Sequence, residues 1–208
     1  MATHWIWYVI APLVIIGCAL FYWRRYQRNK AAATAYATQR GWTYTERDQD
    51  LLGRCHGAPF DGFGRRRRAW HAVRGQHGPY EVLSFEYSEV RGRNHGNRYA
   101  RRVFRQLASL KLPFPAHEVY ATPRGRIGRL ANQAGLTGSG TGNPDIDSEW
   151  ATEGLIPPAV QDWLATHRRR PFRVVAGRLE TWHEGRFDPN RIDPAVADLE
   201  DLAQRLSR

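Results

Sequence analysis

The stretch EVLSFEYSE, Glu81–Glu89, decides how this chain of 208 residues folds. Its side chains alternate between apolar and polar, which is the pattern of an extended segment whose successive side chains lie on opposite faces. We therefore predict a strand with one apolar and one polar face. The apolar set is Leu83, Phe85 and Tyr87, and the polar set is Ser84, Glu86 and Ser88.

The neighbouring segments also predict β-structure. AWHAVRG, Ala69–Gly75, predicts a shorter strand, and Gln76–Pro79 suits a hairpin connection between the two. WTYTE, Trp42–Glu46, alternates aromatic residues with threonine and predicts a further strand. Near the C-terminus, Gly177-Arg178 separates two runs of β-forming residues and suits a two-residue type II′ turn.

Three segments predict helices. Ala31–Gly41 is rich in alanine and ends in a glycine that suits the C′ position. Pro157-Pro158 opens a second helix, and Asp193-Pro194 suits the N-cap and first position of a third. The residues at helical spacing are Val160, Trp163, Leu164 and His167 in the second helix, and Val196, Leu199, Leu202 and Leu206 in the third.

Together these patterns predict an α+β fold, in which an N-terminal transmembrane helix precedes a soluble domain with an antiparallel sheet and packed helices. The predicted organisation has an anchor with a basic flank in residues 1–30, an α+β subdomain in 31–134, a Gly-rich loop in 135–150, and a helix–hairpin–helix part of the same domain in 151–208.

The uncharged run WIWYVIAPLVIIGCALFYW, Trp5–Trp23, predicts the transmembrane helix. At 1.5 Å per residue it is roughly 28 Å long, which matches a hydrocarbon core of about 30 Å. No Lys or Arg precedes the run and four basic residues follow it, which predicts a single-pass plasma-membrane protein with its N-terminus outside and residues 24–208 in the cytoplasm. The predicted membrane-interface residues are Trp5, Trp7, Tyr22, Trp23, Arg24, Arg25, Arg28 and Lys30.

A signal peptide and a lipidated N-terminus are the two alternatives for this run. A signal peptide should begin with a basic region and end in small residues, and the sequence has neither. Ile15–Cys18 resembles a bacterial lipobox, but Cys18 is followed by further apolar residues instead of a polar linker. The second cysteine, Cys55, lies in the domain, so the sequence contains no disulfide framework.

Charge is the unusual feature of the composition. The formal net charge is +11, and almost all of the 31 basic residues are arginine. A possible anion-binding site is the tetrad Arg65, Arg66, Arg67 and Arg68, which could bind the phosphate groups of lipid or nucleic acid. We expect the anionic headgroups of a lipid bilayer as the partner of the basic flank, and we disfavour nucleic acid because no recognised binding motif accompanies the charge.

The sequence resembles a family of single-pass membrane-anchored proteins of high-GC Gram-positive bacteria, to which no activity is assigned. The resemblance implies a strand over Val103–Leu112, where the apolar spacing by itself favours a helix. It implies no catalytic residue. The motifs that carry it are ATQRGWTY (Ala37–Tyr44), GAPFDGFG (Gly57–Gly64), RRRAWHAVRG (Arg66–Gly75), VLSFEYSE (Val82–Glu89), PPAVQDWL (Pro157–Leu164), PFRVVAGRLETW (Pro171–Trp182) and GRFDPNRID (Gly185–Asp193).

Motifs of known chemistry are missing. H-E-x-x-H, Cys-x-x-Cys, G-x-S-x-G and G-x-x-x-x-G-K-[ST] do not occur, and the Gly-rich segment Gly135–Asp145 matches none of them. We expect no catalytic residue, no cofactor and no metal, and predict a non-enzymatic, membrane-tethered interaction module with a protein partner still to be found. The alternatives are an enzyme whose site is assembled from scattered residues, and a basic domain that binds anionic lipid or nucleic acid.

Overall fold

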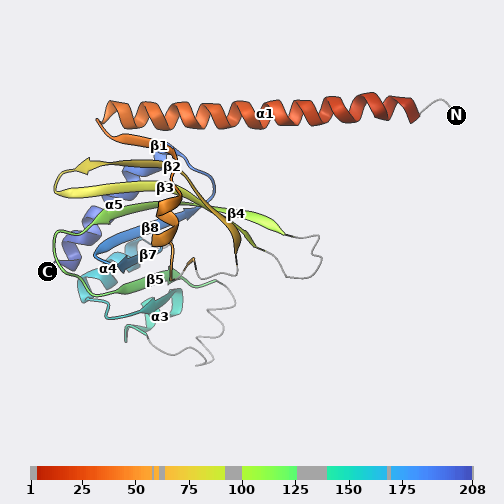
Figure 1. The fold of residues 1–208 in the computed structure, drawn as a ribbon. Helices are drawn as coiled ribbons and strands as arrows, with labels where there is room; N and C mark the ends of the chain where they lie inside the picture. The colour runs from red at the N-terminus through yellow and green to blue at the C-terminus, as the bar shows by residue number, and fades with distance from the viewer. Residues whose placement is uncertain are drawn as a thin grey trace.

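The computed structural model describes residues 4–57, 59–60, 64–91, 100–125, 140–167 and 170–207, except for the side chains of residues 4–7 and 9–11. Within this part, eight strands form one antiparallel sheet in the order β1-β2-β3-β4-β8-β7-β5-β6 (Figure 1). The strands are β1 Thr43–Arg47, β2 Arg65–His77, β3 Tyr80–Arg91, β4 Arg101–Lys111, β5 Val119–Pro123, β6 Trp150–Glu153, β7 Phe172–Val175 and β8 Arg178–Glu184.

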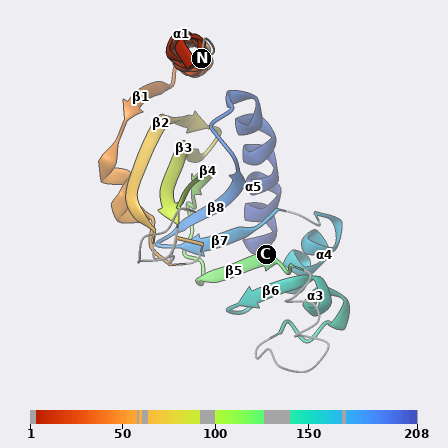
Figure 2. The ribbon, with the colours of Figure 1, turned by 90° about the vertical axis from the view of Figure 1, so that its right-hand side faces the viewer.

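Helices cover one face of the sheet, and a short 3-10 segment covers part of the other (Figure 2). The long helix α1 lies along the β1 edge, and α5 runs across the face formed by β4 and β8. The α-helices are α1 His4–Gln39, α3 Pro144–Glu149, α4 Pro158–Thr166 and α5 Ile192–Leu206, and the 3-10 helices are η1 Gln49–Arg54 and η2 Pro189–Arg191.

The alternation in β3 is confirmed, and it divides the domain into two cores. Leu83, Phe85 and Tyr87 pack with η1 on one face, whereas Val82 joins the core beneath the helices on the other. Ser84, Glu86 and Ser88 alternate with these residues and lie on the same face as Val82, and they too are buried. Buried polar groups need hydrogen-bond partners, so the contacts of these three side chains determine which segments pack on this face of the sheet.

The α+β class and the antiparallel sheet agree with the sequence analysis. The segment implied by the resemblance is the strand β4, although its apolar spacing favours a helix. Leu107 and Leu110 lie on opposite faces of the sheet, one in each core, and this explains the misleading spacing. In the sheet, β8 and β7 from residues 151–208 lie between β4 and β5 from residues 31–134, so the two segments share one fold.

Two local predictions need correction. The β7–β8 turn consists of Ala176 and Gly177, whose φ angles of 48° and 70° are both positive. Such a pair requires a type I′ turn instead of the predicted type II′ turn at Gly177-Arg178. Helix α5 begins at Ile192 with Arg191 as its N-cap, so Asp193 is not the cap. Its carboxylate instead accepts hydrogen bonds from Tyr36 on α1 and from Arg40 directly after the helix.

The prediction for the N-terminal run also needs correction. Within the part of the chain that the structure describes, no helix has the length and apolar character needed to cross a membrane. The predicted transmembrane helix in residues 1–30 is therefore wrong, and so is the single-pass plasma-membrane topology with residues 24–208 in the cytoplasm. The run Trp5–Trp23 is one end of α1, and this helix continues through four basic residues to pack on the sheet.

Candidate functional site

The N-terminal half of α1 projects past the ends of the strands (Figure 1). Cys18 on this half is a free, exposed thiol. Large apolar side chains are exposed all along it, and exposed apolar surface of this extent marks an interaction site. They are Leu13, Val14, Ile15, Ile16, Leu20, Phe21, Tyr22 and Trp23, each more than half exposed.

The C-terminal half of α1 is held to the sheet by polar contacts. The Tyr26 hydroxyl and the Lys30 ammonium both donate to the carboxylate of Glu46 on β1. Further along, the Tyr36 hydroxyl donates to Asp193 Oδ1 over 2.6 Å, and Ala33 and Ala37 are buried beneath the helix. The projecting half is therefore continuous with a docked helix.

His71 lies at the centre of this junction. It sits at an irregularity of β2, and its φ of 53° is unusual for a residue other than glycine. Its ring centroid lies 5.5 Å from that of Tyr26 on α1 and 5.5 Å from that of Phe187. The Nδ1 atom is 2.8 Å from the Tyr44 hydroxyl. One buried imidazole thus contacts α1, β1 and the segment after β8.

Stability should fall on mild acidification because of His71. Burial lowers its pKa from the usual value, with a smaller lowering from Arg186 and Lys30 and an opposing effect of Glu46. Between the lowered pKa and about 6.5, the unfolded chain binds more protons than the folded chain, so the free energy of unfolding falls as pH decreases through this window. We expect His71→Phe to flatten this dependence in urea unfolding at pH 7.5 and 5.5. An unchanged slope would contradict the assignment.

The segment after β8 is fixed to the sheet by the buried polar groups of its helix face. Glu86 Oε2 accepts from the Phe187 N–H over 2.8 Å. Gln106 Nε2 donates to the Asp188 carbonyl, and Gln106 Oε1 accepts from the Asp188 N–H, both over 2.9 Å. These bonds set the positions of the neighbouring Arg186 and Arg191.

A cavity of about 450 Å³ lies between α1 and this segment, and we call it the junction cavity. Arg25 and Arg28 enter its wall from α1, and Arg186 and Arg191 from the opposite side. Within the described residues, no ion pair involves Arg25, Arg28 or Arg186. The guanidinium of Arg186 instead lies 3.9 Å from the ring centroid of Phe104.

Further arginines extend this cationic region along the sheet. Burial, and then the charges of Arg68, Arg66 and Arg186, lower the pKa of Arg102, with Glu86 opposing them. Arg186 therefore links the cations of the junction cavity to those at the start of β4. The start of β4 lies at the end of the sheet toward which α1 projects (Figure 1). We call this region the basic surface, and it consists of Arg25, Arg28, Arg66, Arg68, Arg102 and Arg186.

The structure separates the arginine tetrad of the sequence analysis. Arg66 and Arg68 belong to the basic surface, whereas Arg67 donates to the Phe60 carbonyl on the other face of the sheet. Arg65 is exposed on β2. Of the predicted interface residues, Tyr22, Trp23, Arg24, Arg25 and Arg28 are exposed on α1, Lys30 is paired with Glu46, and the side chains of Trp5 and Trp7 lie outside the described part.

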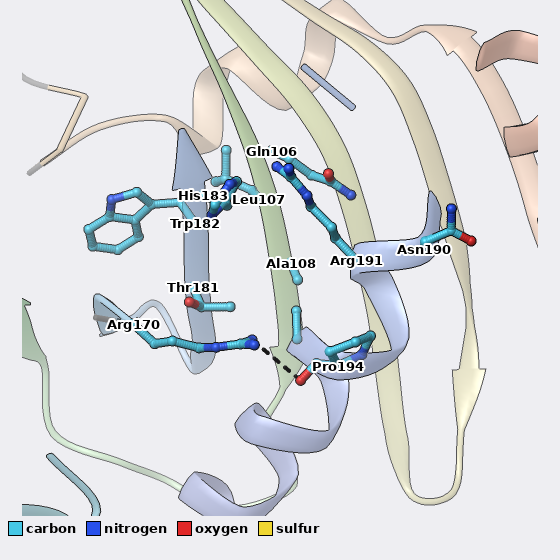
Figure 3. A pocket seen from close by; sticks show the side chains of 11 residues that line it. Gln106, Leu107, Ala108, Arg170, Thr181, Trp182, His183, Asn190, Arg191 and Pro194 are labelled. Carbon is cyan, nitrogen blue, oxygen red and sulfur yellow. Dashed lines mark hydrogen bonds between the residues drawn. The ribbon is translucent and has the colours of Figure 1, made fainter. Parts of the chain in front are cut away.

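A second cavity of about 400 Å³ lies beside the junction cavity, and we call it the α5 pocket (Figure 3). Strands β4 and β8 form its floor, and η2 with the first turn of α5 forms a wall. Arg191 points toward Gln106 and His183 at one end, and Arg170 reaches across the other end toward the Pro194 carbonyl. Asn190 and Arg191 line both cavities.

Comparison with known proteins gives a structural neighbour. The chain is similar in structure to the mycobacterial trehalose monomycolate transport factor A. The TM-score is 0.55 over 86% of this chain and 94% of that chain, at 12% sequence identity. No family model and no curated protein matches the chain. At this identity the likeness establishes a shared fold and carries no residue roles.

Sequence reasoning missed Arg102, Arg170, Arg186, Arg191 and His183. They come from three separate segments and meet only through the order of β4 and β8 in the sheet. The motif GRFDPNRID contained Arg186 and Arg191. Nothing in the motif indicated that Glu86 and Gln106 would bind its backbone on the helix face of the sheet.

Proposed function

We propose that the protein is a non-enzymatic binding module that works at an anionic lipid surface, which it contacts through the projecting half of α1 and the basic surface. The observation that carries the proposal is the exposed apolar segment of α1, followed at once by Arg24, Arg25 and Arg28. Apolar side chains with adjacent cations match the two components of such a surface, acyl chains and negative headgroups.

The position of the basic surface supports lipid as the occupant. It includes the start of β4, at the end of the sheet toward which the helix projects, so the cations and the apolar segment of α1 belong to the same end of the molecule. Basic residues near an anionic surface contribute about 1 kcal/mol each. A protein groove would require an apolar stripe on one side of the helix, whereas this segment is exposed and apolar over successive turns.

A binding role is also supported by the state of the groups that could act in catalysis. Burial raises the pKa of the Cys55 thiol to about 12, so that this cysteine stays protonated. The structural neighbour is named for transport, which is also a role in binding.

Vesicle flotation tests the proposal. The full chain, diluted from detergent, should float with vesicles containing phosphatidylglycerol, and less with pure phosphatidylcholine or at high salt. Arg25→Gln with Arg28→Gln should weaken binding about 30-fold, because two basic residues contribute about 2 kcal/mol. The matched control is Lys111→Gln with Arg205→Gln, since Lys111 lies at the opposite end of β4 from Arg101.

Three results would contradict lipid binding at this surface. They are equal flotation with both kinds of vesicle, equal weakening by the control pair, and tight binding to RNA or to another protein that competes with the vesicles. The last result would identify a different class of partner for the same surface.

A further inference from the structure

We propose that the basic surface contains a site for a phosphate monoester carried by a lipid, formed by Arg68, Arg102 and Arg186. We call these three residues the arginine site. The inference rests on the proposed function, because it names the head group that the lipid contact selects. That head group is a terminal phosphate, in preference to a phosphodiester.

The register of three neighbouring strands brings the arginine site together. Ser88 on β3 pairs with Arg68 on β2 and with Phe104 on β4. Side chains paired in this way lie on the same face of the sheet, about 5 Å apart. Arg68 and Phe104 therefore lie on either side of Ser88, on the helix face.

Two guanidinium groups lie over this row. Arg102 Nη1 donates to Ser88 Oγ over 3.1 Å and to the Arg66 carbonyl over 3.2 Å, so its guanidinium is held between β2 and β3. Nη1 carries only two of the five N–H donors of an arginine, so a ligand oxygen can still bind. The guanidinium of Arg186 lies 3.9 Å from the ring centroid of Phe104. Two of the three cations are thus fixed at neighbouring points of the row.

A β-bulge directs the third cation, Arg68, to the same face. Arg65 pairs with Val90 and Arg68 with Ser88, so β2 has one residue more than β3 between the two pairs. Residues three apart in an unbroken strand lie on opposite faces, whereas here both arginines lie on the helix face. Bulges that redirect a side chain in this way are common beside functional sites.

The positive charge of the arginine site is not neutralised by ion pairs. Among the described residues, no ion pair includes Arg68, Arg102 or Arg186. Glu86, the next residue of β3 on this face, is buried, and its Oε2 accepts from the Phe187 N–H. Burial, and then the neighbouring arginines, lower the pKa of Arg102, and a bound anion would oppose this lowering.

Three guanidinium groups match a terminal phosphate better than a phosphodiester. A phosphate monoester carries about 1.5–2 negative charges at pH 7 and has three oxygens that accept strong hydrogen bonds. A phosphodiester carries a single charge and has two such oxygens, and so does a carboxylate. Each guanidinium presents a planar fork of N–H donors that suits a pair of phosphate oxygens. Only the monoester can engage all three arginines through separate oxygens.

The position of the site favours a lipid as the carrier of this phosphate. Trp70 lies two residues after Arg68 on β2, and its ring centroid is 6.2 Å from that of Tyr26 on α1. Tyr26 comes three residues after Trp23, which ends the exposed apolar segment of α1. The arginine site therefore lies beside the place where α1 leaves the sheet, and head groups would be found there if the apolar segment enters the lipid.

Vesicle flotation of the full chain compares the two kinds of phosphate. Phosphatidylcholine vesicles contain either phosphatidic acid, a monoester, or phosphatidylglycerol, a diester, in amounts that give equal zeta potentials. We expect about tenfold tighter binding to phosphatidic acid, which is the effect of one further hydrogen bond between charged groups. Equal binding would overturn this inference and leave the proposed function standing, whereas no binding to either kind of vesicle would overturn both.

Matched variants locate the preference. Arg68→Gln with Arg186→Gln should abolish it, and so should Arg68→Lys with Arg186→Lys, which keeps the charge but removes the fork of donors. The control is Arg101→Gln with Lys111→Gln, since both residues are exposed on β4 and alternate onto the other face. A full preference in either arginine variant, or an equal loss in the control, would contradict the proposed site.

Soluble head groups distinguish a lipid from a free ligand. In nonionic detergent, millimolar glycerol 3-phosphate should shift the Nε–H resonances of Arg102 and Arg186 in nuclear magnetic resonance spectra of the full chain. Glycerophosphoglycerol, a diester, should shift them less at equal ionic strength. The absence of any shift with glycerol 3-phosphate would overturn the proposal, and saturation at micromolar concentration would identify a soluble phosphate monoester as the ligand instead of a lipid.

Discussion

Replacing Leu13, Ile16 and Leu20 together by glutamine is expected to weaken binding to phosphatidylglycerol vesicles by at least about 1,000-fold. The three side chains are 53% to 61% exposed and lie at helical spacing on α1. Moving such a side chain from water into an apolar medium contributes about 1.5–3 kcal/mol, so the triple variant should lose about 4 kcal/mol or more. Flotation over a range of lipid concentrations gives the affinity.

Glutamine is chosen for this variant because it is a good helix former, so the helix itself should persist. Circular dichroism should therefore show an unchanged helix content. Leu155→Gln is the matched control, since Leu155 is 76% exposed but belongs to the domain. If the triple variant floats as well as the unaltered chain, or if Leu155→Gln weakens binding to the same degree, the projecting half of α1 is not the lipid contact.

Replacing Arg173 by methionine is expected to destabilise the domain by about 3–5 kcal/mol. Arg173 and Glu180 face each other across β7 and β8, with side chains that are 4% and 5% exposed, and Arg173 Nη2 lies 2.7 Å from Glu180 Oε2. The same guanidinium donates to the His56 carbonyl and so holds the end of η1 over the sheet. Its removal leaves the charge of Glu180 buried without its main partner.

A double-mutant cycle in urea separates this cause from a simple loss of packing. Arg173→Met combined with Glu180→Leu should be less destabilised than Arg173→Met alone, because the unpaired charge is gone. Arg205→Met, which breaks the half-exposed pair with Asp201 and the hydrogen bond to the Ala159 carbonyl but leaves no charge fully buried, should change the free energy of unfolding by less than about 2 kcal/mol. Additive effects of the two substitutions would show that the buried charge is not the cause.

Local patterns predicted much of the fold. Alternation in Glu81–Glu89 gave the right faces, and Gly41 ends α1 with a φ of 65° as a C′ glycine should. The pattern failed where burial on both faces removed the contrast, as in β4, whose two apolar sets enter different cores. It also failed for Trp5–Trp23, because an apolar composition does not show whether a helix ends with the run or continues onto a sheet.

The candidate site was less accessible to prediction. The basic flank of α1 and the tetrad were visible as charge, but their connection runs through Arg186 and Arg102, which are far apart in sequence. The α5 pocket depends on β8 pairing with β4 and on Gln106 binding the Asp188 backbone. Such contacts follow from the topology of the whole sheet, and no window of sequence contains them.

The continuity of α1 has a geometric consequence. The helix passes from its exposed apolar end to the sheet without a linker, and the contacts of Tyr26 and Lys30 with Glu46 prevent it from swivelling. A flexible linker lets a domain change its orientation freely. A continuous helix instead fixes the distance and the angle between the domain and the far end of the helix. On a lipid surface, every copy of the domain would thus have the same orientation, and the α5 pocket would lie at one constant distance from the lipid headgroups.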